Sequence, residues 1–173
     1  MTFIPDYDIR FSEESDFSVL DRWFSDPSAC DPFPFGFEER VDALKNWIGF
    51  ARYHASLTGT IQDVPCAIGT LFLMPYKKVA HHCSFYLYVE PEHRRKGIGT
   101  SMVRNLLHLA KTRFRLESVH AELFEPSSLL SILQKFQFEL FARQENYVKI
   151  NGRGRPRLLL EHFFQSDRGM HSS

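Results

Sequence analysis

The chain has 173 residues, of which 43% are hydrophobic and 24% are charged. This composition is ordinary for a folded globular protein and argues against disorder, and the length suits one domain with a full-sized core. Lysine plus arginine and aspartate plus glutamate balance at 21 each, so the zero net charge gives no general attraction to nucleic acid or to anionic membranes. No apolar run approaches the ~20 residues that a membrane-spanning helix requires.

The three cysteines, Cys30, Cys66 and Cys83, are widely spaced and odd in number, which does not indicate a disulfide framework. A reducing compartment is the simpler interpretation, and the first residues lack the basic and apolar regions of a signal peptide. We therefore expect a cytoplasmic protein. We also expect residues 1–173 to form a single domain, with 165–173 as a flexible tail.

The first half of the sequence predicts two helices between short strands. In chain order, the expected elements are a strand at Tyr7–Phe11, a helix from Ser12 or Ser15 to about Phe24, a proline-rich loop at Ser25–Phe35 and a helix from Glu38 to about Ser56. The apolar stripe of the second helix comprises Val41, Leu44, Trp47, Ile48 and Ala51. From Leu57 the apolar period becomes that of strands, at Leu57–Ile61, Cys66–Met74 and His82–Val89.

The second half predicts a strand–helix–strand unit followed by a hairpin. The strand His82–Val89 has bulky residues on both faces and should be covered on both sides. The elements that follow are a helix at Thr100–Phe114, a strand at Ser118–Leu123, a helix at Ser127–Phe136, and strands at Phe138–Ile150 and Leu158–Phe164 joined across Asn151–Arg157. The crossover from Cys83 to Leu123 should be right-handed and parallel. We expect a mixed α/β fold whose mostly antiparallel sheet has one parallel strand pair and helices on both faces.

The most informative stretch is Val89–Thr100, which joins a buried strand to the N-terminus of a helix. The first N–H groups of a helix have no partner within it and the dipole is positive there, so such a place binds phosphate readily. Gly97 and Gly99 allow the backbone to approach an anion closely. The side chains that can add charge or a hydroxyl are Arg94, Arg95, Lys96 and Thr100. The sequence thus predicts a concave, cationic set of N–H donors that fits a diphosphate.

Three other interpretations of this stretch compete. A Rossmann dinucleotide site needs a third glycine where Met102 stands, and a P-loop needs a Gly-Lys-Ser/Thr sequence that is absent. A basic surface turn without a ligand fits the short pattern about as well as a diphosphate site does. The buried strand, Pro91, and the strong helix that follows weigh against that plain interpretation.

The stretch Tyr88–Gly99, with the spacing Arg94-x-x-Gly97-x-Gly99, resembles the acyl-CoA signature of the GNAT superfamily of N-acyltransferases. The order of the expected elements also matches that fold. The resemblance extends from Tyr7 to Phe164 and is strongest over Phe85–Ala110. The late stretch 135–152 resembles, more weakly, the ribosomal-protein and aminoglycoside acetyltransferase branches of the superfamily.

The resemblance implies that acetyl-CoA is the cosubstrate and that Arg95–Thr100 holds its pyrophosphate. In this family the signature strand usually carries a bulge and splays from its parallel neighbour, and the cofactor arm pairs in that gap like an added strand. A backbone N–H near Val89 would polarise the thioester, and a neutral primary amine of a protein N-terminus or a small molecule would attack it directly in a ternary complex. The implied cofactor-binding residues are Leu87, Tyr88, Val89, Arg94, Arg95, Lys96, Gly97, Ile98, Gly99 and Thr100.

The sequence departs from the family at the usual catalytic acid. Members often have a tyrosine in the helix before the last hairpin, and that place holds Leu133. The asparagine that is common at the start of that helix falls near Pro126, and the serine of some branches falls near Leu129. Another group or solvent then protonates the leaving thiolate, or the protein is a non-catalytic module that binds or senses CoA.

Two residues are candidates for acid–base catalysis. Glu90 ends the signature strand and could deprotonate the incoming ammonium directly or through water. The alternative for Glu90 is a solvated carboxylate before Pro91. Tyr147 on the late hairpin could reach the same cleft as an acid, and its alternative is an aromatic side chain that packs on the sheet.

Neither a metal nor a nucleic acid is expected as a partner. His81 and His82 stand next to Cys83, but consecutive strand residues point to opposite faces and make a poor chelate. The basic cluster Arg153–Arg157 is interpreted as a solvated hairpin tip rather than an RNA contact. Membrane binding is not expected either. The oligomeric state stays open, with a dimer as one option.

Overall fold

The computed structural model describes residues 3–166, which contain one seven-stranded sheet of strand order β1-β2-β3-β4-β5-β7-β6. Only β4 and β5 run parallel, and every other neighbouring pair is antiparallel. The strands are β1 (Tyr7–Phe11), β2 (Ser56–Ile61), β3 (Val64–Leu73), β4 (His82–Val89), β5 (Ser118–Phe124), β6 (Glu139–Ile150) and β7 (Arg153–Phe163). The expected mixed α/β fold with one parallel pair is confirmed.

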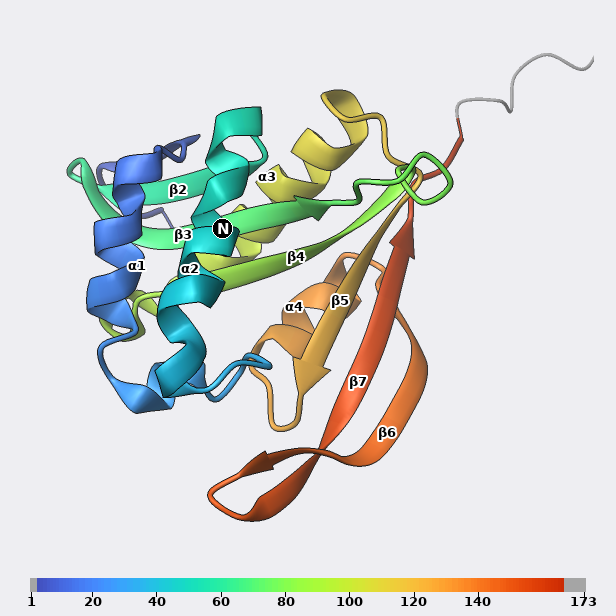
Figure 1. Cartoon of the computed structure of the whole chain (residues 1–173). Coiled ribbons are helices and arrows are strands. Elements are labelled where there is room, and N and C mark those ends of the chain that lie inside the picture. The colour runs from blue at the N-terminus through green and yellow to red at the C-terminus, as the bar shows by residue number, and fades with distance from the viewer. Residues whose placement is uncertain (1–2, 167–173) are drawn as a thin grey trace, which may run out of the picture.

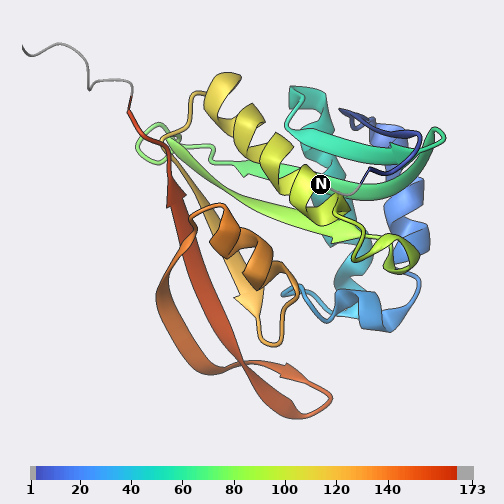
Figure 2. The ribbon, with the colours of Figure 1, turned by 180° about the vertical axis from the view of Figure 1, so that it is seen from behind.

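Helices cover both faces of this sheet. The α-helices are α1 (Phe17–Trp23), α2 (Arg40–Gly49), α3 (Ile98–Thr112) and α4 (Leu129–Lys135). Helices α1 and α2 lie on the face that Figure 1 presents, and α3 and α4 lie on the opposite face, seen in Figure 2. Short 3-10 turns extend several of these elements, at Glu14–Asp16, Pro27–Cys30, Phe37–Glu39, Phe50–Tyr53 and Pro91–His93. No helix within residues 3–166 has the length and apolarity to cross a membrane.

Each helical layer packs on its own apolar core. On the α3 side, the helix stripe predicted from the sequence is buried, with Met102 and Val103 at most 1% exposed. On the α1–α2 side, aromatic residues fill the core around Trp47 and Phe24, both 0% exposed. Strand β4 contributes Phe85 to the first core and Tyr88 to the second, because alternate strand residues point to opposite faces. The prediction that β4 is covered on both sides is therefore confirmed.

The first helix begins at Phe17, later than the expected Ser12 or Ser15, and Ser12 belongs instead to a buried hydrogen-bond network. The Ser12 hydroxyl lies 2.8 Å from Thr58 Oγ1, which donates to Asp16 Oδ2 at 3.0 Å. Arg10 donates to both carboxylate oxygens of Asp16, at 2.8 and 2.9 Å. Helix α1 follows the 3-10 turn Glu14–Asp16, and the N–H of its N-cap residue, Glu13, donates to Asp16 Oδ2. The network ties β1 and β2 to the start of α1.

Two other local expectations were wrong. The second helix does not continue to Ser56, which begins β2, and Val41 of its predicted stripe is 37% exposed. The hairpin between β6 and β7 turns through only Asn151 and Gly152, both at positive φ, so the cluster Arg153–Arg157 lies within β7 and not in a loop. Asn-Gly is a strong signal for a two-residue hairpin turn. Of the expected tail, residues 167–173 lie outside the described part of the chain.

Candidate active site

Strands β4 and β5 diverge after a short parallel ladder. They pair only from His82↔Ser118 to Ser84↔His120. Beyond these pairs β4 continues to Val89 against β3, and β5 continues to Phe124 against β7. The two strands separate like the arms of a V (Figures 1 and 2), and we call the opening between residues 85–89 and 121–124 the gap. The implied splay is present, but the implied bulge is not, because the register of β4 with β3 runs without a shift.

The hydrogen-bond phase of β4 decides which backbone groups face the gap. The N–H of Glu90 donates to the carbonyl of Cys66 on β3 at 2.9 Å. Residues of an antiparallel strand alternate in direction, so Tyr88 also turns its backbone groups to β3, whereas Leu87 and Val89 turn theirs to the gap. The carbonyl of Val89 accepts a hydrogen bond from Arg94 Nε at 2.8 Å. Leu87 and the Val89 N–H thus form the part of the edge that an added segment can pair with, and Tyr88 does not.

The turn Arg94–Gly97, which we call the cofactor turn, is open to solvent. All four of its residues are exposed. Arg95 and Gly97 have φ of 61° and 88°, and such alternation of backbone handedness aims successive N–H groups at one point. A Cβ added at Gly97 would meet no heavy atom within 4 Å. The space beside Gly97 is therefore free for an anion.

Helix α3 begins directly after this turn. Its N-cap, Gly97, has no side chain that could cap the first N–H groups, and no capping hydrogen bond from a described side chain replaces it. The N–H groups of Ile98, Gly99 and Thr100 are the unpaired first donors of the helix. The Ile98 side chain is 1% exposed and anchors the start of α3 in the core. The residues fit the phosphate-binding role that the sequence indicated.

The two glycines have different tasks. A Cβ on Gly99 would lie 3.1 Å from Cδ1 of Ile132 on α4 and 4.0 Å from Cγ2 of Val89. Gly99 is therefore the point at which α3 packs closely against α4 and β4. Gly97, with its positive φ and open surroundings, is the glycine that permits close approach of an anion.

The three cations of the stretch also differ. Arg94 is drawn back to β4, where its Nε binds the Val89 carbonyl and its guanidinium lies 5.2 Å from the centre of the Tyr88 ring. Arg95 and Lys96 are exposed and make no ion pair with any residue of 3–166. Arg95 and Lys96 are thus free to neutralise a diphosphate, while Arg94 braces the strand.

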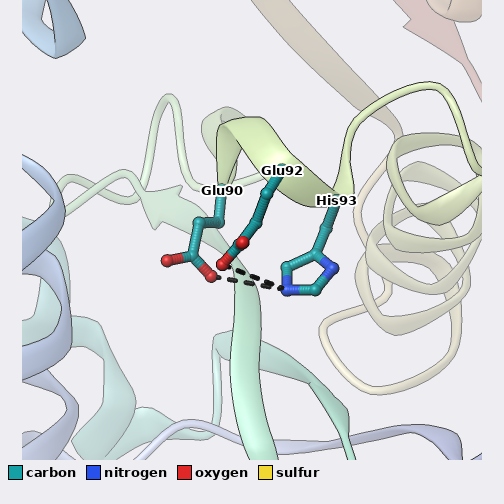
Figure 3. Close-up of side chains that lie close together, drawn as sticks. All are labelled: Glu90, Glu92 and His93. Atoms are coloured by element: carbon teal, nitrogen blue, oxygen red, sulfur yellow. Dashed lines mark ion pairs between the residues drawn. The ribbon is translucent and has the colours of Figure 1, made fainter.

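Glu90 lies where β4 ends, on the face that α1 and α2 cover. Its carboxylate faces the ring of His93 (Figure 3), with Oε2 3.6 Å from Nε2. The Glu90 side chain is 22% exposed. Burial raises the pKa of the neighbouring Tyr88, the charge of Arg94 lowers it, and those of Asp26 and Glu90 raise it further. Glu90 is therefore a partly shielded carboxylate beside the gap, as its predicted role requires.

A second carboxylate on this face, Glu122, was not singled out in the sequence. It lies two residues beyond His120 of the last parallel pair, level with Tyr86 across the start of the gap. Burial, together with the charge of Glu122, raises the pKa of Tyr86 to about 12. Glu122 Oε2 is 2.7 Å from Nε of Arg157, an ion pair without the geometry of a hydrogen bond. The available signal was the single acid of β5, the strand that pairs in parallel with the signature strand.

The other catalytic candidates fall in different places. Tyr147 is 49% exposed, and its ring stacks on Phe124 at 6.2 Å with the guanidinium of Arg157 4.3 Å from its centre. It thus stands beside Glu122 and Arg157 on the β5–β7 side of the gap, and within residues 3–166 it forms no hydrogen bond or ring contact with Glu90. Leu133 is 0% exposed and belongs to the core under α4.

A sequence comparison identifies the family to which the chain belongs. The model of the acetyltransferase (GNAT) family matches residues 10–131, which include β4, the cofactor turn and α3. The chain belongs to the GNAT family. It is therefore an acyltransferase by family. No curated protein matches the chain in sequence.

Solved structures share the fold of this GNAT protein at low sequence identity. A protein from Salmonella typhimurium, solved with its cofactor acetyl-CoA, has a TM-score of 0.76 at 13% identity and covers 97% of this chain and 99% of its own. A ribosomal-protein-alanine N-acetyltransferase from Brucella melitensis has a TM-score of 0.74 at 17% identity, over 91% and 99%. RimJ of Mycobacterium smegmatis, in complex with CoA-disulfide, has a TM-score of 0.69 at 13% identity, over 91% and 81%.

Proposed function

We propose that this GNAT protein transfers an acetyl group from acetyl-CoA to a primary amine by direct attack in a ternary complex. One observation carries the proposal: the edge of β4 that faces the gap is followed, after only the short 3-10 turn Pro91–His93, by the cofactor turn. The turn and the first N–H groups of α3 would hold the pyrophosphate, with Arg95 and Lys96 adding charge. The related structures with acetyl-CoA and CoA-disulfide support this assignment by fold.

The backbone of β4 would position the donor. Leu87 and the Val89 N–H face the gap, so they can pair with an extended pantetheine arm as a strand pairs with a sheet edge. The acetyl thioester supplies an activated carbonyl. A backbone N–H of this edge would donate to the carbonyl oxygen, where negative charge develops during attack. Arg94 holds the carbonyl of Val89 and thereby fixes the direction of that edge.

The acceptor would enter on the α1–α2 side, where two carboxylates border the gap. Glu122 stands at the start of the gap and is oriented by Arg157, so we propose that it removes the proton from the ammonium. Glu90 stands at the end of β4 and would attract the ammonium or relay its proton through water. Tyr147 is the proposed donor of a proton to the leaving thiolate, with solvent as the alternative.

The acceptor class is a protein N-terminus or a small amine. Two related structures, from Brucella melitensis and Vibrio fischeri, are ribosomal-protein-alanine acetyltransferases, which favours a protein N-terminus. An amine and peptide panel, scored by release of the CoA thiol, tests this choice. Thiol release above the hydrolysis background with an N-terminal peptide supports transfer, and release with no amine of the panel contradicts it.

The second candidate function is a module that binds CoA without catalysis. It is favoured by Leu133, which is buried where many relatives have a tyrosine. Calorimetry with acetyl-CoA separates the possibilities, because both functions require binding and only the first requires thiol release. Absence of binding at millimolar acetyl-CoA would contradict both.

We also propose that the whole chain forms one domain that works in the cytoplasm. A single sheet joins β1 to β6, and the three cysteines are buried and free of disulfides. Burial raises the pKa of Cys66 to about 11 and that of Cys83 to about 12, so both thiols stay protonated at neutral pH. One cooperative unfolding transition, unchanged by a reductant, would support this organisation.

A further inference from the structure

Three potential metal ligands converge at the end of β4. Glu90, Glu92 and His93 each direct one ligand atom to the same point, and these atoms all lie within 4.8 Å of one another (Figure 3). His93 Nε2 lies 3.6 Å from Glu90 Oε2 and 3.8 Å from Glu92 Oε1. The other ring nitrogen of His93 is buried and has no hydrogen-bond partner among residues 3–166, so the ring interacts through Nε2.

The backbone under this cluster is firmly held. The Glu90 N–H donates to Cys66 of β3, the His93 N–H donates to the Glu90 carbonyl at 2.9 Å, and the Arg94 N–H donates to the Pro91 carbonyl at 3.2 Å. Pro91 fixes φ at the first position of the 3-10 turn. The turn therefore presents its three side chains with little freedom of the backbone to lose on binding.

The donor set and its spacing suit zinc. An imidazole nitrogen with two carboxylate oxygens is a set that zinc accepts, whereas magnesium prefers oxygen alone. Ligand atoms about 2.0–2.1 Å from a tetrahedral zinc lie about 3.3 Å apart, slightly less than the two distances observed here. Glu90 and His93 are 22% and 23% exposed, so two ligands are shielded. Glu92, at 73%, can swing to complete the site.

We propose that Glu90, Glu92 and His93 form a zinc-binding site that inhibits acetyl transfer when it is occupied. The site adjoins the gap, because Glu90 follows Val89, whose N–H borders the gap. Zinc would engage the Glu90 carboxylate and add positive charge where a cationic acceptor must approach. The inhibitory part rests on the proposed function, whereas the binding part does not.

The site lies away from the histidines that the sequence brought to notice. His82 of β4 has its ring 5.0 Å from that of His81 and 4.7 Å from that of His120 on β5. Their ligand atoms do not form a group of three within the described part of the chain. These histidines are the alternative site at which zinc could bind, and substitution of His82 is therefore the matched control.

A competition titration of the full, untagged chain against a chromophoric zinc chelator tests binding. One zinc per chain is expected, and His93→Gln and Glu92→Gln should each weaken it by at least about tenfold. His82→Gln should leave it unchanged. Equal affinity in wild type and His93→Gln, or loss of binding in His82→Gln, would overturn the site.

Initial rates of thiol release then test inhibition. Zinc should slow the wild type, and Glu92→Gln should keep the zinc-free rate while losing most of its sensitivity to zinc. Equal sensitivity in both proteins would overturn the inhibitory role. If neither protein releases thiol with any amine, the proposed function fails, and the titration alone still decides whether the metal site exists.

Discussion

The two sides of the gap are built in different ways. On the β4 side, the strand edge, the cofactor turn and the first turn of α3 come from one continuous stretch of sequence. On the β5–β7 side, Glu122, Tyr147 and Arg157 come from three separate strands and meet only because β7 lies between β5 and β6. A site that binds with backbone groups can be local in sequence, whereas a site that reacts with side chains depends on the pairing of distant strands.

The largest expected effect is on the β4 side, at Gly97. Gly97→Asp should weaken acetyl-CoA binding by about 100-fold, because a negative charge roughly 6 Å from the pyrophosphate opposes it by about 2–3 kcal/mol at an intermediate dielectric. Titration calorimetry measures the loss. Gly97→Asn is the matched control, since asparagine tolerates positive φ similarly and adds no charge, and it should lose much less affinity. Equal losses of acetyl-CoA affinity in the two variants would contradict the proposal that this turn binds the pyrophosphate.

A comparable effect, but on kcat, is expected on the β5 side. Glu122→Gln should lower kcat by about 100-fold, because it removes the proposed general base and keeps the shape of the side chain. Affinity for acetyl-CoA should not change. Glu90→Gln is the comparison and should lower kcat only about tenfold. A larger loss of kcat in Glu90→Gln than in Glu122→Gln would show that Glu90, not Glu122, is the general base.

A smaller effect is expected from the hydroxyl of Tyr147. Tyr147→Phe keeps the ring that stacks on Phe124 and carries Arg157, so loss of the proposed acid should lower kcat by about tenfold without a change in acetyl-CoA affinity. Steady-state kinetics and calorimetry on the same preparation measure both quantities. A kcat equal to that of the wild type would assign protonation of the thiolate to solvent.

The last expected effect is on stability rather than on binding or catalysis, away from both sides of the gap. Burial by itself raises the pKa of Asp16, but hydrogen bonds from Arg10, the Glu13 N–H and Thr58, with the charge of Arg10, outweigh it and lower the pKa. A lowered folded-state pKa stabilises the fold above the unfolded pKa of about 3.9, and that stability is lost as the pH falls through the folded value.

Asp16→Asn should therefore lower the free energy of unfolding by about 2 kcal/mol at pH 7, and by less at pH 3, which lies below the unfolded pKa of about 3.9. Denaturant unfolding at the two pH values measures the difference. Ser18→Ala, on the exposed side of α1, is a suitable control and should have little effect at either pH. A loss of equal size at both pH values would show that the charge of Asp16 is not what matters.

Much of the fold could be read from local patterns. The stripe of Met102, Val103 and Leu106 predicted α3, and the two-sided apolar pattern of β4 predicted a covered strand. The predicted hairpin loop is too long, because the interpretation of Arg153–Arg157 as a solvated tip overlooks Asn151-Gly152, which specifies a two-residue turn. Val41 fits the helical spacing of apolar residues but faces solvent, because that spacing does not tell how much of the helix surface the rest of the protein covers.

The sequence by itself determined the features on which the proposed anion site rests, because two glycines, adjacent cations and a helix start without a capping side chain are properties of neighbouring residues. It could not determine which backbone groups of β4 face the gap, because that depends on the hydrogen-bond phase with β3. Nor could it bring Glu122 level with Tyr86, or Arg157 onto Glu122, since these contacts follow from strand order and register. Tertiary structure alone decided which side chains border the proposed acceptor side, because these residues are far apart in the chain and share one face of the sheet.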